Sequence, residues 1–104
     1  MNTLANQLLQ DNTDAQLAEI IHTLCSAGQD IAFRVSRGAL ANILGEAASE
    51  NVQGETQKKL DILANDILKE QLLALPQVAA IASEEEAHPV TGNKQGRFVV
   101  AFDP

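Results

Sequence analysis

Apolar residues recur at helical spacing along three segments before Pro76. The first segment predicts an amphipathic helix over residues 14–27, capped by the Asn12-Thr13-Asp14 cluster and ended by Gly28. The second segment predicts a helix over residues 31–45. Residues 46–55 lose the period, so we expect a loop there. The third segment has the clearest helical period, and its apolar stripe consists of Leu60, Leu63, Ala64, Ile67, Leu68, Leu72 and Leu75.

The pattern changes after Pro76, where two short apolar runs replace the helical period. Residues 78–82 and 97–102 have the length of buried β-strands, and the second run is rich in valine and phenylalanine. The connecting residues 87–96 contain the turn-forming types His88-Pro89 and Thr91-Gly92-Asn93. The sequence therefore predicts an α/β fold in which N-terminal helices are followed by strands.

Acidic residues follow each predicted strand. Glu84, Glu85 and Glu86 come directly after the first strand, and Asp103 follows the second. If the two strands run in the same direction, these acids meet at the carboxyl ends, where open α/β sheets tend to bind ligands. Mg²⁺ takes one or two carboxylates, keeps waters and completes its shell with phosphate oxygens. A charge run after a strand is also typical of a solvated loop, and the pattern alone leaves both interpretations open.

Length, charge and cysteine content restrict the class of protein. The 104 residues suffice for one domain with a modest core, and 45% hydrophobic residues is typical of a globular chain. The formal net charge of −7 comes without a basic stripe, which argues against a nucleic-acid partner. No apolar stretch approaches the roughly 18 residues of a membrane span, so we expect no membrane partner. Cys25, which we expect to be packed on the first helix, can form no internal disulfide and agrees with a reducing cytoplasm.

Five blocks of residues share an order and spacing with a known family. They are Asn51-Val52-Gln53-Gly54-Glu55, Lys58-Lys59-Leu60-Asp61, Ala64-Asn65-Asp66, Ala82-Ser83-Glu84-Glu85-Glu86 and Val99-Val100-Ala101-Phe102-Asp103-Pro104. In these blocks the chain resembles class I fructose-1,6-bisphosphatase of the bacterial type, and residues 37–45 are similar to that family's second helix. The resemblance covers essentially the whole chain.

The resemblance implies a layered α/β/α sugar-phosphatase fold and a function in gluconeogenesis, the Mg²⁺-dependent hydrolysis of the 1-phosphate of fructose 1,6-bisphosphate. Carried over by position, it implies that Glu84, Glu85 and Asp103 are metal ligands. It implies that Asp61 pairs with Glu85 to orient and deprotonate the attacking water. Clustered carboxylates are unfavourable as neighbours, and divalent cations then neutralise them.

The same resemblance places a mobile loop at residues 49–59, whose Glu55 is a catalytic acid that closes over the metals. In the family the Asp-Pro pair continues into Leu-Asp-Gly-Ser-Ser, whereas this sequence ends at Pro104. We therefore expect residues 1–104 to be the N-terminal part of a single domain, truncated before the rest of the sheet. Without the remaining ligands and the sugar-binding half, we expect these residues alone to be inactive.

Regulation and assembly follow the resemblance less completely. Many members of the family bind AMP through a Thr-Gly-Glu-Leu-Thr segment that corresponds to residues 14–18, which lack both threonines, so the resemblance leaves AMP regulation open. The family is usually a homotetramer, and we expect a cytoplasmic homo-oligomer. A second hypothesis is a catalytically silent helical module that serves folding or oligomerisation.

Overall fold

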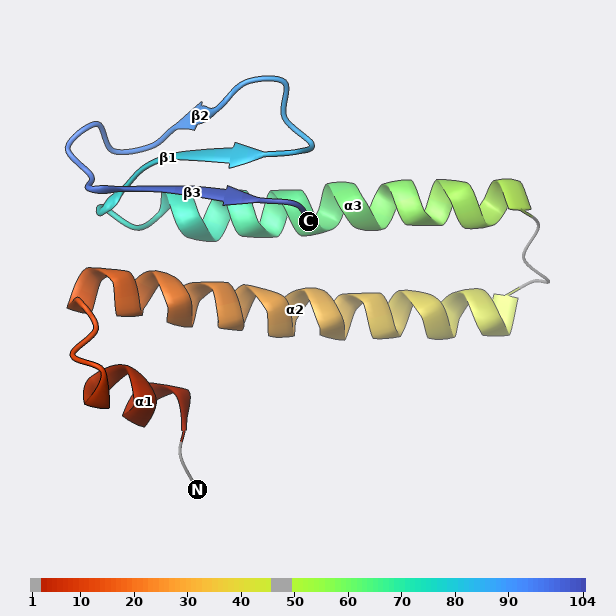
Figure 1. Cartoon of the computed structure of the whole chain (residues 1–104). Coiled ribbons are helices and arrows are strands. Elements are labelled where there is room, and N and C mark those ends of the chain that lie inside the picture. The colour runs from red at the N-terminus through yellow and green to blue at the C-terminus, as the bar shows by residue number, and fades with distance from the viewer. Residues whose placement is uncertain (1–2, 46–49) are drawn as a thin grey trace.

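The computed structural model describes the backbone of residues 3–45 and 50–104, and the side chains of residues 3–38 and 57–104. Three helices precede a small mixed sheet, which is an α/β arrangement as predicted (Figure 1). The elements, in chain order, are α1 (Leu4–Gln10), α2 (Ala15–Gly45), α3 (Glu50–Leu73), β1 (Val78–Ser83), β2 (Val90–Thr91) and β3 (Phe98–Phe102). No helix in the described ranges is long and apolar enough to cross a membrane.

The two helices predicted before residue 46 form one continuous helix, α2, so the predicted break at Gly28 is wrong. Gly28 keeps a negative φ, and a side chain added there would meet nothing within 4 Å. A glycine inside a helix costs only about 1 kcal/mol relative to alanine, which the packing of α2 against α3 offsets. The predicted cap is confirmed, since Asp14 Oδ1 accepts hydrogen bonds from the backbone N–H groups of Gln16 at 2.9 Å and Leu17 at 3.3 Å.

Helix α1 is a feature that the apolar pattern did not predict. Its seven residues are too few for a clear period. Thr3 caps it by accepting a hydrogen bond from the Asn6 N–H at 3.1 Å, and Asn12 turns the chain towards α2 with a φ of 53°. Cys25, predicted to be packed, is exposed on α2.

Helix α3 begins at Glu50, so the loop predicted for residues 46–55 is wrong for residues 50–55. Residues 46–49 lie outside the described part of the chain. The resemblance placed a mobile loop at residues 49–59, and residues 50–59 of that range are helical instead. Glutamate and glutamine are good helix formers, and the segment continues directly into the strong apolar stripe of α3, which explains why the helix extends towards its N-terminus.

The sheet has the strand order β2-β1-β3, with β1 parallel to β3 and antiparallel to β2. The pairing Ser83↔Phe102 brings the carboxyl ends of β1 and β3 level with each other. Glycines let the loop around β2 lie close to β1. A Cβ atom at Gly92 would stand 2.7 Å from the Val78 carbonyl oxygen, and one at Gly96 would stand 2.7 Å from the Gln77 carbonyl oxygen.

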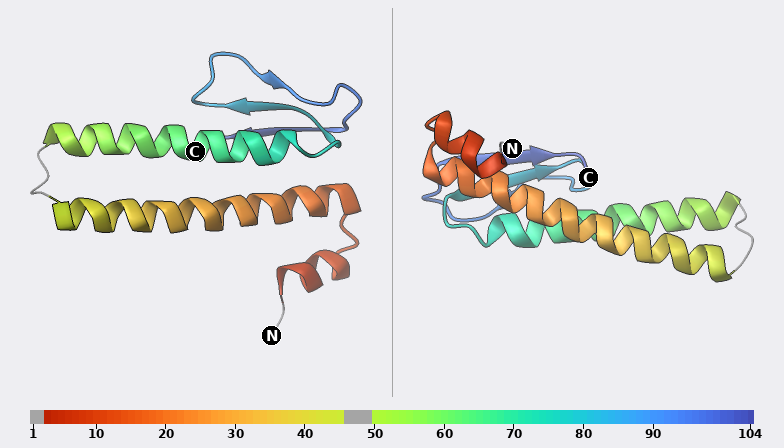
Figure 2. Two further views of the ribbon diagram at one scale, coloured as in Figure 1. Left: turned by 180° about the vertical axis from the view of Figure 1, so that it is seen from behind. Right: turned by 90° about the horizontal axis from the view of Figure 1, so that it is seen from below.

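The core lies where the sheet meets the helices. Ile20 of α2, Leu72 of α3 and Val78 and Ile81 of β1 form its buried centre. Both figures show α2 and α3 side by side, with the sheet next to the half of α3 that leads into β1 (Figures 1 and 2). The other halves of α2 and α3 extend beyond the sheet, so the acidic strand ends lie beside the middle of α3 rather than at the end of the molecule.

Candidate functional site

Two carboxylates meet where the parallel strands β1 and β3 end. The backbone N–H of Glu84 donates to the Phe102 carbonyl at 3.2 Å, which extends the ladder one step past β1 and places Glu84 beside Asp103. A hydrogen bond to Asp103 and the negative charge of that residue raise the pKa of Glu84 above its usual range. Partial desolvation and the charges of Glu85 and Asp61 add to the rise. The site therefore concentrates negative charge that favours a proton or a cation.

Asp61 approaches this pair from α3, so the structure brings together residues that are far apart in sequence. Its Oδ1 accepts a hydrogen bond from Gln57 Nε2 at 3.1 Å, and its charge acts on Glu84. Glu85 is exposed. The pairing of Asp61 with Glu85 stays a prediction. Glu55 lies on the N-terminal part of α3, and its side chain is outside the described set.

The chemical type of the ligand atoms at this edge of the sheet suits a hard cation. Glu84, Asp103 and Asp61 offer only carboxylate oxygens, the ligands that Mg²⁺ prefers. The pKa of Glu84 is raised by the hydrogen bond to Asp103 and because neighbouring carboxylates repel its charged form, and a divalent cation would relieve this repulsion. Among the described side chains of residues 3–38 and 57–104, however, no three from His, Cys, Asp or Glu converge closely enough to hold a metal ion. The ligand set of Glu84, Glu85 and Asp103 therefore stays a prediction.

The turn that carries the acids is held by a polar network that sequence reasoning missed. Ser83 Oγ donates to Asn65 Oδ1, and both residues are buried, at 7% and 6% exposure. Glu86 Oε1 accepts from Asn65 Nδ2 at 3.1 Å and from Lys69 Nζ at 3.0 Å. These hydrogen bonds lower the pKa of Glu86, and the bond from Lys69 contributes most.

A sequence signal for this network existed. Asp61, Asn65 and Lys69 are spaced four residues apart, which places them on one face of a helix. That face meets the end of β1, because Asn65 and Lys69 both contact Glu86. The third acid of the run is thus neutralised within the chain, whereas the first is surrounded by other acids.

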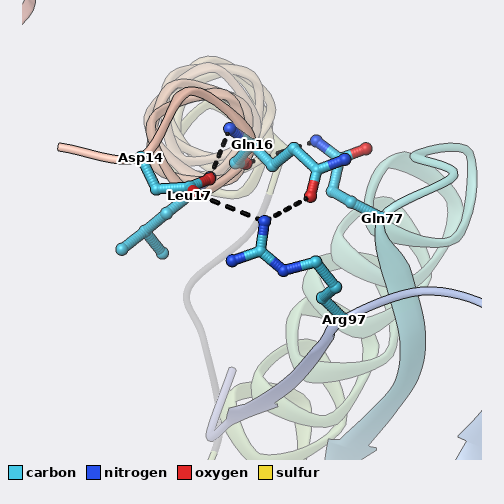
Figure 3. A network of polar contacts seen from close by, with 5 residues as sticks. All are labelled: Asp14, Gln16, Leu17, Gln77 and Arg97. Carbon is cyan, nitrogen blue, oxygen red and sulfur yellow. Dashed lines mark hydrogen bonds and ion pairs between the residues drawn. The ribbon is translucent and has the colours of Figure 1, made fainter.

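A second network joins the start of α2 to the opposite end of β3 (Figure 3). Arg97 Nη1 donates to Asp14 Oδ2 at 3.2 Å and to Gln16 Oε1 at 3.1 Å. Gln77 Nε2 donates to the Gln16 carbonyl at 3.3 Å. The hydrogen bond from the backbone N–H of Leu17 is the main cause that lowers the pKa of Asp14, and contacts with Gln16 and Arg97 lower it further. This network fixes α2 to the sheet at the end opposite the acids Glu84 and Asp103, and it uses neither of these carboxylates.

A largely apolar pocket of about 440 Å³ lies between α1 and the first turns of α2. It is lined by Ala5, Leu8, Leu9, Thr13, Ala15, Ala18, Glu19 and His22. Ala18 presents a methyl group to this pocket.

Comparison with known proteins agrees with the arrangement of these elements. The family model of the fructose-1-6-bisphosphatase N-terminal domain matches residues 2–104. The class 1 fructose-1,6-bisphosphatases of Cellvibrio japonicus and Saccharophagus degradans are 51% and 52% identical to the chain over all 104 residues. The chain spans about a third of each relative, 32% of its length. It belongs to the fructose-1,6-bisphosphatase family, to whose N-terminal domain these residues correspond.

Proposed function

We propose that residues 1–104 supply the acidic, metal-binding edge of a Mg²⁺-dependent fructose-1,6-bisphosphatase that removes the 1-phosphate of its substrate. The observation that carries this proposal is the meeting of Glu84 and Asp103 at the ends of two parallel strands, where their like charges raise the pKa of Glu84. The names of the relatives support the choice of substrate.

In this proposal Glu84, Glu85 and Asp103 hold the cation. Mg²⁺ held by these residues would supply Lewis-acid chemistry: it would polarise the phosphoryl group, lower the pKa of a water and offset charge on the leaving oxygen. Asp61, half-buried on α3, orients the attacking water together with Glu85 and takes its proton. Glu55 joins from the N-terminal part of α3. The reaction then depends mainly on position and electrostatics, because phosphoryl transfer asks for little covalent chemistry from the protein.

The same proposal extends to the setting of the protein. It places the protein in the cytoplasm, in gluconeogenesis, as a homotetramer without a nucleic-acid or membrane partner. The net charge of −7 supports the exclusion of nucleic acid, because a phosphate backbone would be repelled. The absence from residues 14–18 of both threonines of the family's AMP-binding segment counts against AMP regulation.

A hybrid enzyme tests the proposal. Residues 1–104 replace the matching segment of the Cellvibrio japonicus relative, and phosphate release from fructose 1,6-bisphosphate is measured against Mg²⁺ concentration. We expect Mg²⁺-dependent turnover from the hybrid enzyme, and none from residues 1–104 alone. Circular dichroism and light scattering establish that the hybrid has folded and assembled. A folded, assembled hybrid without activity would contradict the proposal and favour the silent helical module.

A further inference from the structure

Ser83 stands at the point where the end of β1, the acidic turn and α3 meet. Its hydroxyl donates to Asn65 Oδ1 and accepts from the Glu85 N–H at 3.2 Å. Its carbonyl accepts from the Glu86 N–H at 3.0 Å. One residue therefore binds two of the three amides of the acidic turn, and the Glu84 N–H is bound by Phe102.

Asn65 supplies the other half of the attachment, because both ends of its amide are used. Its oxygen accepts from Ser83, and its nitrogen donates to Glu86 at 3.1 Å. The amide thus spans the turn from the last residue of β1 to the third acid. Asn65 is only 6% exposed, so water cannot easily replace either bond.

The turn needs such an attachment because its acids repel one another. Among the described side chains, the charged groups that raise the pKa of Glu84 are the acids Asp103, Glu85 and Asp61. Lys69 neutralises Glu86 alone, so repulsion of Glu84 by the other acids would move the backbone of the turn unless it is held. The bonds of Ser83 and Asn65 oppose this movement without neutralising Glu84 or Glu85, so both carboxylates stay available to a ligand.

We infer that Ser83 and Asn65 are positioning residues that hold the backbone of residues 84–86 so that the Glu84 and Glu85 carboxylates are presented beside Asp103. The consequence for catalysis rests on the function proposed above. The consequence for the backbone does not, because it follows from hydrogen bonds between residues of this chain alone. Groups that orient metal ligands typically change metal affinity or activity about 10- to 100-fold when they are replaced.

Amide hydrogen exchange of the 104-residue chain is the first test. In Ser83→Ala, the Glu85 amide loses its acceptor and should exchange about tenfold faster, while the amides of α3 around Leu72 keep their rates. Ser83→Thr retains a hydroxyl and should restore slow exchange at Glu85. Ser36→Ala, an exposed serine on α2, is the matched control and should change neither region. An unchanged Glu85 rate in Ser83→Ala, with the core intact, would overturn the inference.

The second test uses the hybrid enzyme. We expect Ser83→Ala to raise the Mg²⁺ concentration for half-maximal activity about tenfold or more, with little change in KM for the sugar, and Ser83→Thr to reverse the change. An unchanged Mg²⁺ requirement would overturn the catalytic part of the inference. A hybrid enzyme that is inactive even without substitution would instead reject the proposed function, and the exchange rates would still decide whether Ser83 positions the turn.

Discussion

The two ends of β3 solve the problem of charge in opposite ways. At the amino end, Arg97 meets Asp14 and Gln16, so a cation and an anion satisfy each other within the chain. At the carboxyl end, Asp103 meets Glu84, and the charged groups that shift the pKa of Glu84 are all acids. A contact between opposite charges is complete in itself, whereas a contact between like charges requires a proton or a cation. The comparison supports the proposal that the carboxyl end is the functional one.

Substitution of the acids should have the largest effect. In the hybrid enzyme, Glu84→Gln or Glu85→Gln should lower Mg²⁺-dependent turnover by about a hundredfold or more, because each exchange removes charge and little volume. Glu70→Gln, an exposed acid on α3, is the control and should retain activity. Near-normal phosphate release by both Glu84→Gln and Glu85→Gln would show that the carboxyl ends of β1 and β3 are not the catalytic site.

Loss of the buried amide should have the next largest effect. Asn65→Ala removes the buried acceptor of the Ser83 hydroxyl and one of the two side-chain donors to Glu86, so the free energy of unfolding should fall by about 1–3 kcal/mol. Urea denaturation of the 104-residue chain measures it. Asn6→Ala on exposed α1 should stay within about 0.5 kcal/mol of the original chain. Equal effects of the two substitutions would mean that the network does not stabilise the turn.

Stability should depend on pH in opposite directions for the first and third acids of the turn. An acid whose pKa is raised by folding destabilises the fold as pH rises from its ordinary value, 4.5 for Glu84, through the raised pKa. Without divalent cations, Glu84→Gln should therefore raise the thermal midpoint at neutral pH, and the gain should vanish in acid.

Glu86 supplies the contrast, because its pKa is lowered by Lys69 and Asn65. Its contribution to stability is present above its ordinary pKa and is lost as pH falls through the lowered one. Glu86→Gln should therefore lower the thermal midpoint at neutral pH. If both glutamine variants shifted the midpoint in the same direction at neutral pH, the distinction between the two acids would be wrong.

The opposite end of β3 should give the smallest effect. Arg97→Gln removes an ion pair whose side chains are 61% and 42% exposed, and such pairs are screened by water and salt. We expect a slight fall of the thermal midpoint at low salt and none in 1 M NaCl, with activity of the hybrid enzyme unchanged. A large, salt-independent loss would mean that this network supports the core.

The sequence predicted the elements with strong periodicity. The apolar stripe of α3 and the strands β1 and β3 appear where the pattern placed them. It did not predict α1 or β2, because seven and two residues carry no readable period. The sequence also predicted a break in α2 at Gly28. Local helix propensity contains no information about packing against a neighbouring helix, which stabilises α2 despite the glycine.

The candidate site was predictable only in part for the same reason. The acids could be found because they follow apolar runs. Whether they lie close together depends on the two strands being parallel, and the sequence of a strand does not indicate its direction relative to its neighbour. The bond of Ser83 to Asn65 joins residues 18 positions apart and becomes visible only when β1 packs on α3. Residue types thus indicated the chemistry, and the tertiary contacts supplied the positions.

Binding of Mn²⁺ to the isotopically labelled 104-residue chain, followed by nuclear magnetic resonance, tests most directly whether the carboxyl end of the sheet binds a divalent cation. Mn²⁺ broadens the signals of nearby amides. We predict that Glu84, Glu85 and Asp103 broaden at the lowest Mn²⁺ concentration and that Mg²⁺ restores their signals. Broadening that begins equally at the exposed acids Glu19 and Glu70, or that Mg²⁺ does not reverse, would contradict a divalent-cation site between β1 and β3.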